Sequence, residues 1–172
     1  PSKLPGGYDW YSNSNIELGR AVRREVEVLI RKKRVDTFIF GGALGVDQMA
    51  FQVVYKLKKT KYSYLNLILA MPFERQDNSW IEESKMVLRK QKQLADKVVL
   101  VDELKEYSIK GIPTKIYNPL KMQKRNEYMV DNADYLIAVW DGTGGGTKNC
   151  VDYYKRSKNL KNLIVIDPRK IE

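Results

Sequence analysis

Apolar positions follow helical spacing in some stretches of the chain and form continuous runs in others. The spacing that begins at Leu18 predicts a helix over residues 14–34, where Ser14 and Glu17 have the spacing of a capping box. Continuous apolar runs bounded by glycine, proline or charged residues are typical of strands buried on both faces. Such runs predict strands at residues 35–40, 64–71, 97–101, 135–140 and 163–166.

Helical patterns separate these strands. They cover residues 46–58, residues 80–95 after a second capping box at Ser79 and Glu82, residues 121–132, and a stretch that begins after Thr147. Alternating strands and helices predict a single α/β domain over residues 1–172, a Rossmann-like three-layer sandwich with a mostly parallel sheet. Residues 102–120 have no clear period and are the best candidate for a mobile lid or an oligomer contact.

Composition narrows the classes of function. The formal net charge of +10 favours an anionic partner, although the lysine-rich runs alone are typical of solvated helix ends. The chain has no histidine, which excludes a Ser-His-Asp nucleophile, a His-ligated zinc and an imidazole acid or base, and we expect no metal and no cofactor. One cysteine, no membrane-length apolar run and no basic-then-apolar leader predict a cytoplasmic protein without membrane contact.

Two glycine-rich loops each follow a predicted strand and precede a predicted helix. This order presents backbone N–H groups to an anion at the positive end of a helix dipole, so both loops are candidate phosphate sites. A surface turn and close packing of helix on strand are the alternatives. Asp47 in the first loop would bind a ribose hydroxyl or simply complement the helix dipole. The loop residues concerned are Gly41, Gly42, Gly45 and Asp47, and Asp141, Gly142, Thr143, Gly144, Gly145, Gly146 and Thr147.

Further candidates lie on a helix and in other loops. Arg125 shares the apolar stripe of its helix with Met122 and Met129, so it should face the protein and needs an anion, either a nearby aspartate or a ligand. Phe73 and Trp10 are loop aromatics that could stack on a base.

Three segments together resemble the SLOG superfamily, which includes the LOG phosphoribohydrolases, the DprA recombination mediators and the YpsA-like proteins. GGALGVDQMA at residues 41–50 is similar to the first glycine motif of that family. AMPFERQDNSW at residues 70–80 and RNEYMVDNADYLIAVWDGTGGGT at residues 125–147 resemble the PFxxQxxxW, RNxxMVDxAD and GGT segments of YpsA-like and phage-encoded members. The resemblance extends over nearly the whole chain.

The resemblance implies a catalytic role for Arg125 and a nucleotide-type ligand. LOG enzymes keep a glutamate at the position that matches Cys150, so cleavage here would need a carboxylate from elsewhere, for which Glu74 is the candidate. Cys150 itself reads as a packed small residue, with a pKa that a helix N-terminus would lower. The family begins with a strand that the sequence given lacks, and we expect that it is truncated.

Three functions follow from these observations. The first is binding of a nucleotide or nucleotide-derived ligand, such as an ADP-ribose or NAD derivative or a signalling nucleotide, which the protein would sense or sequester. The second is N-glycosidase or phosphoribohydrolase activity that uses Glu74 and Arg125. The third is DprA-like binding of single-stranded nucleic acid, which the basic charge favours but the lack of an aromatic platform does not. A homo-oligomer is expected in each case.

Overall fold

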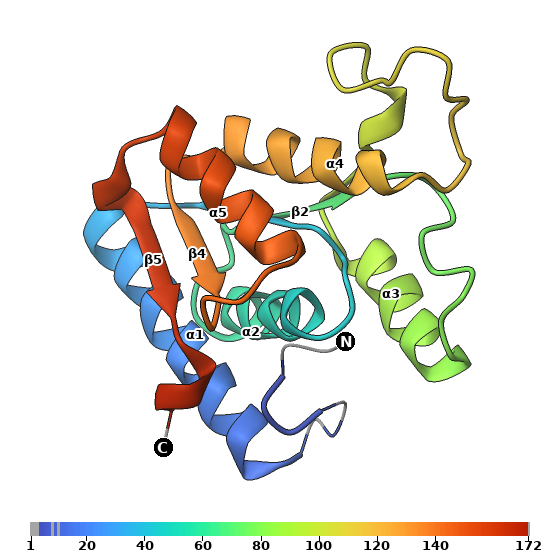
Figure 1. Ribbon diagram of the computed structural model, residues 1–172. Helices are drawn as coiled ribbons and strands as arrows, with labels where there is room; N and C mark the ends of the chain where they lie inside the picture. Colours follow the sequence, from blue (N-terminus) through green and yellow to red (C-terminus); the bar gives the residue numbers. More distant parts are fainter. Residues whose placement is uncertain (1–3, 8, 10, 172) are drawn as a thin grey trace.

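The computed structural model describes residues 4–7, 9 and 11–171, and in these residues five α-helices alternate with five strands (Figure 1). All strand pairs are parallel, which confirms the predicted α/β class. The helices are α1 (Asn13–Lys33), α2 (Val46–Thr60), α3 (Glu82–Leu94), α4 (Pro119–Asp131) and α5 (Gly146–Ser157). The strands are β1 (Thr37–Phe40), β2 (Asn66–Met71), β3 (Lys97–Leu100), β4 (Leu136–Val139) and β5 (Leu163–Ile166), with short 3-10 turns at Val101–Glu103, Leu160–Asn162 and Pro168–Lys170.

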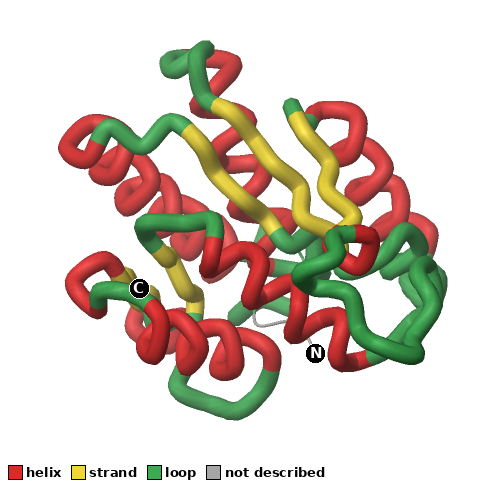
Figure 2. The backbone as a smooth tube through the Cα atoms, turned by 90° about the horizontal axis from the view of Figure 1, so that it is seen from above, coloured by secondary structure: helices red, strands yellow, loops and turns green. Residues whose placement is uncertain are grey.

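The strands form two small sheets instead of one. One has the order β1-β2-β3, with Phe38 opposite Leu67, and the other joins β4 to β5, with Ile137 opposite Ile164. Figure 2 shows the two groups of strands apart from each other. The expected single sheet is therefore interrupted between β1 and β4.

The order in which the chain adds strands changes direction at this interruption. It runs outward from β1 through β2 to β3, returns through α4, and then continues through β4 to β5. In Figure 1, α1 and α2 lie on one side of the strands and α4 and α5 on the other. This arrangement gives the three layers predicted from the sequence. In open parallel sheets, ligands bind beyond the carboxyl ends of the strands where the direction of winding reverses.

The largest core cluster lies between the sheets and helices α1 and α2. It includes the fully buried Leu67 and Leu69 of β2 and Phe51 and Val54 of α2. A smaller cluster around Ala70, Val99 and Val101 lies on the opposite face, packed by Tyr128 and Met129 of α4. Burial on both faces of β2 explains why its sequence is a continuous apolar run.

Two predicted helix starts are wrong. The side chain of Ser12, not Ser14, accepts the N–H of Asn15 at 3.4 Å and caps α1. Helix α3 begins at Glu82, after Ile81 and without a side-chain cap. The N–H of Trp80 donates to the carbonyl of Asp77 at 2.9 Å, so a turn holds the segment that was expected to open the helix.

Candidate functional site

The first glycine loop connects β1 to α2 and lies close to the side chain of Arg125. A β-carbon on Gly41 would lie 2.6 Å from Cζ of Arg125 and 2.8 Å from Oδ2 of Asp47, so a side chain there would displace both groups. Gly42 and Gly45 have φ angles of 64° and 89°, which also favour glycine. Oδ2 of Asp47, in the first turn of α2, accepts the N–H of Ala43 at 3.1 Å and closes the loop.

Two consecutive residues of α4 connect both glycine loops. Nη1 of Arg125 donates to the carbonyl of Gly41 in the first loop. Nδ2 of Asn126 donates to the carbonyl of Gly146 in the second loop at 3.2 Å, and Oδ1 of Asn126 accepts Nε of Arg125 at 3.1 Å. The two loops therefore meet at the carboxyl ends of β1 and β4.

Arg125 is a buried cation without a close carboxylate partner among the described residues. Its side chain is 9% exposed, and the nearest acid is Asp47, whose Oδ2 lies 4.0 Å from Nη1. That distance is at the limit for an ion pair, and Asp47 is itself partly exposed. Asp131, near the end of the same helix, does not pair with Arg125, because its carboxylate accepts hydrogen bonds from Tyr107 and Tyr153.

The second glycine loop is open and exposed. Space within 4 Å of a β-carbon is empty at Gly142, Gly144, Gly145 and Gly146, and Gly142 and Gly145 have φ angles of 86° and 126°. Helix α5 begins at Gly146, and no side chain caps its first backbone N–H groups, which lie beside this loop. Thr147 is half-buried at the start of the same helix.

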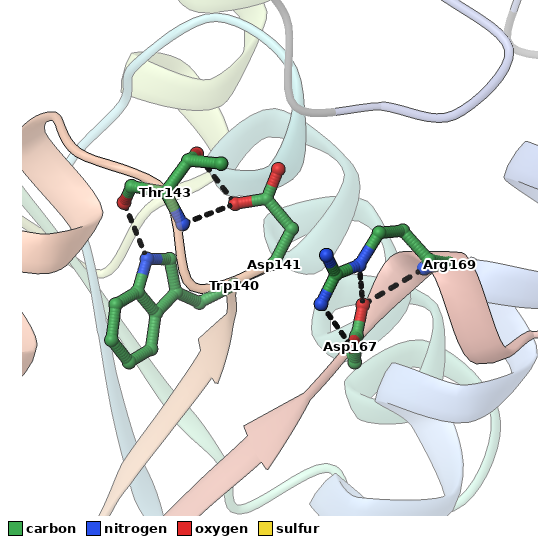
Figure 3. A network of polar contacts seen from close by, with 5 residues as sticks. All are labelled: Trp140, Asp141, Thr143, Asp167 and Arg169. Carbon is green, nitrogen blue, oxygen red and sulfur yellow. Dashed lines mark hydrogen bonds and ion pairs between the residues drawn. The ribbon is translucent and has the colours of Figure 1, made fainter.

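A polar network fixes the second loop at its strand end (Figure 3). Nε1 of Trp140 donates to the carbonyl of Thr143 at 2.8 Å. The N–H and hydroxyl of Thr143 both donate to Oδ1 of Asp141, at 3.0 and 2.6 Å. The Thr143 hydroxyl thus donates to a side chain of the same loop. Beside this network a hollow of about 390 Å³ is lined by Asp167 and Arg169, and hydrogen bonds from Arg169 lower the pKa of Asp167 to about 2.

The loop after β2 joins the site through an amide that sequence reasoning missed. Nε2 of Gln76 donates to the carbonyl of Gly42 at 3.0 Å, and Gln76 is buried. Phe73 is 2% exposed, packed against Tyr117 with ring centroids 6.0 Å apart. The expectation that Phe73 stacks on a base does not fit this interior position. Trp10 lies outside the described residues.

Glu74 faces another part of the chain. Its Oε2 lies 3.3 Å from Nζ of Lys115, and both side chains are about half exposed. The segment that contains Lys115 is held by a buried ion pair between Lys121 and Asp102, 2.8 Å apart and each 3% exposed. Lys121 also donates to the carbonyl of Pro113 at 2.7 Å. Sequence reasoning missed this pair, although Lys121 lies four residues before Arg125 on the same face of α4.

Cys150 is the fifth residue of α5 and lies near Arg125 and Asp47. The charges of Arg125 and Asp47 both influence its thiol, but burial is the larger effect and raises the pKa of Cys150 to about 11. The expectation of a lowered pKa is therefore wrong, because removal from water disfavours the thiolate more than the helix terminus and Arg125 stabilise it. At neutral pH the group beside Arg125 is an uncharged thiol.

Comparison with known proteins identifies the family of this chain. The model of the family described as the YspA SLOG family (YpsA) matches residues 13–170. The chain belongs to the YpsA family of SLOG proteins. This confirms the resemblance drawn from the glycine loops and the RNxxMVDxAD segment.

Individual relatives support the same assignment. The SPbeta prophage-derived protein YoqJ of Bacillus subtilis (strain 168) is 42% identical over 132 residues, which cover 77% of each chain. The UPF0398 protein BH1768 of Halalkalibacterium halodurans is 29% identical over 159 residues, 89% of this chain and 76% of that protein. The UPF0398 protein lwe1908 of Listeria welshimeri is 27% identical over 146 residues, 85% and 72% of the two chains. The phage-borne relative agrees with the likeness to phage-encoded members.

Two absences concern the described part of the chain only. No helix in it is long and apolar enough to cross a membrane. No group of three or more Cys, Asp or Glu side chains in it is arranged to hold a metal ion.

Proposed function

We propose that this YpsA-family protein binds a nucleotide or nucleotide-derived ligand across the two glycine loops, and that it senses or sequesters the ligand. The observation that carries the proposal is the pair Arg125 and Asn126. These consecutive residues of α4 donate hydrogen bonds to both loops, at the point where the strand order changes direction. A site built in this way holds two sets of backbone N–H groups at a fixed separation. Phosphate esters are the ligands that such groups suit.

Electrostatics supports an anionic ligand. Arg125 is buried with its nearest carboxylate at 4.0 Å, and α5 directs its N-terminus toward the open second loop. A ligand phosphate on Gly142–Thr147 would lie at the positive end of that helix, with Arg125 as counter-ion. Asp47, on the first loop, is the candidate for a ribose hydroxyl.

The charges of the site favour binding over cleavage. N-glycosidic cleavage needs a carboxylate near the scissile bond, and Cys150 is an uncharged thiol at the matching position. Glu74 is paired with Lys115 on a different segment. We therefore propose that the ligand is held and not cut.

A charge placed in the second loop tests the proposal. Gly144 has open space around its β-carbon and an ordinary φ angle, so Gly144→Glu and Gly144→Gln should both fold normally. Calorimetric titration with ADP-ribose, NAD, cyclic nucleotides and nucleoside phosphates measures binding to each. We expect one class to bind, with at least about tenfold loss for the Glu variant relative to the Gln variant, since only the carboxylate repels a phosphate.

Two results would count against the proposal. If no member of the panel binds at millimolar concentration, or if the Glu and Gln variants bind equally well, the second loop does not hold a phosphate. If the wild-type protein releases free base from the bound ligand in a chromatographic assay, the protein is an enzyme and the sequestering role is wrong.

A further inference from the structure

Helix α4 is fixed near both ends by residues that precede it in the chain. Residues 104–118, called here the connecting segment, join the turn after β3 to α4 and lie beside the amino-terminal end of the helix (Figure 1). Near that end, Nζ of Lys121 donates to Oδ2 of Asp102 at 2.8 Å. At the other end, the hydroxyl of Tyr107 donates to Oδ2 of Asp131 at 2.8 Å. Lys121 and Asp131 lie about 15 Å apart along the helix axis, so the two contacts together oppose any shift of α4 along that axis.

The contact near the amino-terminal end is a buried ion pair. The side chains of Lys121 and Asp102 are each 3% exposed, and Asp102 follows β3 directly, in the turn Val101–Glu103. Oδ2 of Asp102 also accepts the N–H of Lys115 at 2.8 Å, and Nζ of Lys121 also donates to the carbonyl of Pro113 at 2.7 Å. Oδ1 of Asp102 is buried and has no hydrogen-bond partner within the described residues. Two well-packed apolar side chains are often as stable as such a pair, so we expect the main effect of the pair to be on geometry.

The contact at the carboxyl end joins three elements. Asp131 is the last residue of α4, and its carboxylate accepts the hydroxyl of Tyr107 from the connecting segment at 2.8 Å and that of Tyr153 from α5 at 3.0 Å. The ring of Tyr107 packs edge-on against the ring of Tyr128, with centroids 5.4 Å apart. This end of α4 therefore cannot move relative to the connecting segment or α5 without loss of hydrogen bonds.

The residues that bridge the glycine loops lie between these two contacts. Arg125 is four residues after Lys121 and so lies on the same face of α4. Arg125 donates to the carbonyl of Gly41, and Asn126 donates to the carbonyl of Gly146. A shift of α4 by one residue moves each side chain by about 1.5 Å along the axis. Hydrogen bonds tolerate a range of only about 0.5 Å, so such a shift would break both bridges.

We propose that the two contacts at the ends of α4 are positioning contacts of the ligand site. The buried pair of Lys121 with Asp102 and the hydrogen bond from Tyr107 hold the helix in the register that lets it bridge both loops. Their effect on ligand binding rests on the function proposed above. Their effect on the geometry of the loops does not, and it is measurable without a ligand.

Cys150 reports that geometry, because it is partly buried near Arg125 and is the single cysteine of the chain. The test variant combines Lys121→Met with Asp102→Leu, which removes both charges and keeps apolar side chains of similar size. The matched control is Leu57→Ala, which removes a fully buried side chain of α2 and leaves both contacts of α4 in place. Iodoacetamide at pH 8 measures the reaction of Cys150, and urea unfolding measures the stability of each variant.

The expected effects differ between the two variants. After correction for global unfolding, Cys150 should react at least about tenfold faster in the test variant than in the control, because local displacement of α4 exposes the thiol. Nucleotide affinity, measured by calorimetry, should fall at least about fivefold in the test variant and stay within about twofold of wild type in the control, since small displacements of a binding group cost much of its effect.

A milder pair of variants keeps the test independent of folding. Tyr107→Phe removes one exposed hydrogen bond and keeps the ring, and Lys115→Ala removes the exposed ion pair with Glu74 and leaves the backbone in place. We expect Tyr107→Phe to increase the rate of Cys150 modification about two- to threefold, as loss of one such hydrogen bond implies. Lys115→Ala should leave the rate unchanged.

The outcomes separate this proposal from the proposed function. Equal corrected rates of Cys150 modification in the test variant and the control would overturn the positioning role. Faster modification with unchanged affinity for a nucleotide that the wild-type protein binds would also overturn it. Faster modification together with weaker binding would support it. Faster modification when the wild-type protein binds no nucleotide would support the positioning of the loops and sink the proposed function.

Discussion

Replacement of Gly41 by alanine tests whether the close approach of Arg125 organises the site. The new β-carbon would lie 2.6 Å from Cζ of Arg125 and 2.8 Å from Oδ2 of Asp47, so the guanidinium must move and its hydrogen bond to the carbonyl of residue 41 is lost. Overpacking of this kind costs about 1–3 kcal/mol, and a charged hydrogen bond contributes about 1.5–3 kcal/mol. Because one displacement causes both effects, we expect a loss of about 2–4 kcal/mol.

Thermal and urea unfolding measure this loss. For a chain of this length it corresponds to a fall in melting temperature of roughly 5–15 °C. Gly144→Ala is the matched control, since its β-carbon meets nothing within 4 Å, and we expect its stability to stay within about 0.5 kcal/mol of wild type.

A double-mutant cycle isolates the cause. In the Arg125→Ala background the guanidinium is gone, so Gly41→Ala should cost at least about 1.5 kcal/mol less than in the wild-type background. The reasoning is refuted if the cost is the same in both backgrounds, or if Gly41→Ala is as stable as Gly144→Ala.

Three further predictions concern single groups. Lys121→Met leaves Asp102 buried without its cation and should lower the free energy of unfolding by about 3–5 kcal/mol, with part of the loss recovered by adding Asp102→Leu; urea unfolding measures both. Burial raises the pKa of Cys150 from 9.0 to about 11, so iodoacetamide at pH 8 should modify the native thiol about a hundredfold more slowly than an ordinary thiol, and equal rates before and after denaturation would contradict this. Arg169→Ala should return the pKa of Asp167 from about 2 toward 3.8 in an NMR titration, and an unchanged Asp167 pKa would refute the assignment. Because the native pKa is depressed, the small stabilisation of the folded state by this exposed pair is present above about pH 4 and lost as pH falls toward 2.

The strands and glycine loops were predictable because local patterns determine them. An apolar run such as Asn66–Met71 can be buried on both faces only within a sheet covered by helices, so its sequence already implies the layers. The inward position of Arg125 followed from helical spacing alone. That both glycine loops meet there followed from the parallel order of the strands.

The missed features depend on contacts between residues far apart in sequence. Asn126 and Gln76 are fixed positions of the RNxxMVDxAD and PFxxQxxxW segments, but they were not assigned roles because their partners are backbone carbonyls of distant loops. The Lys121–Asp102 pair was missed since the intervening segment has no regular period. The predicted helix cap at Ser79 was wrong for a different reason. Ser79 satisfies the spacing of a capping box, but a turn that begins at Asp77 includes the same residues.

The uncharged thiol of Cys150 leaves the positive charge of Arg125 without a neutralising partner at that position. A carboxylate at residue 150 would lie near Arg125, neutralise this basic side chain and compete with an incoming phosphate. The thiol is small and remains protonated because burial raises its pKa, so the positive charge of Arg125 stays available and only the partly exposed Asp47 approaches it. The resemblance to LOG enzymes implies a glutamate at this position, so a thiol there would both remove a carboxylate needed for cleavage and strengthen the attraction for an anion. Under the proposed function, this balance of charges favours retention of a phosphate ester over its turnover.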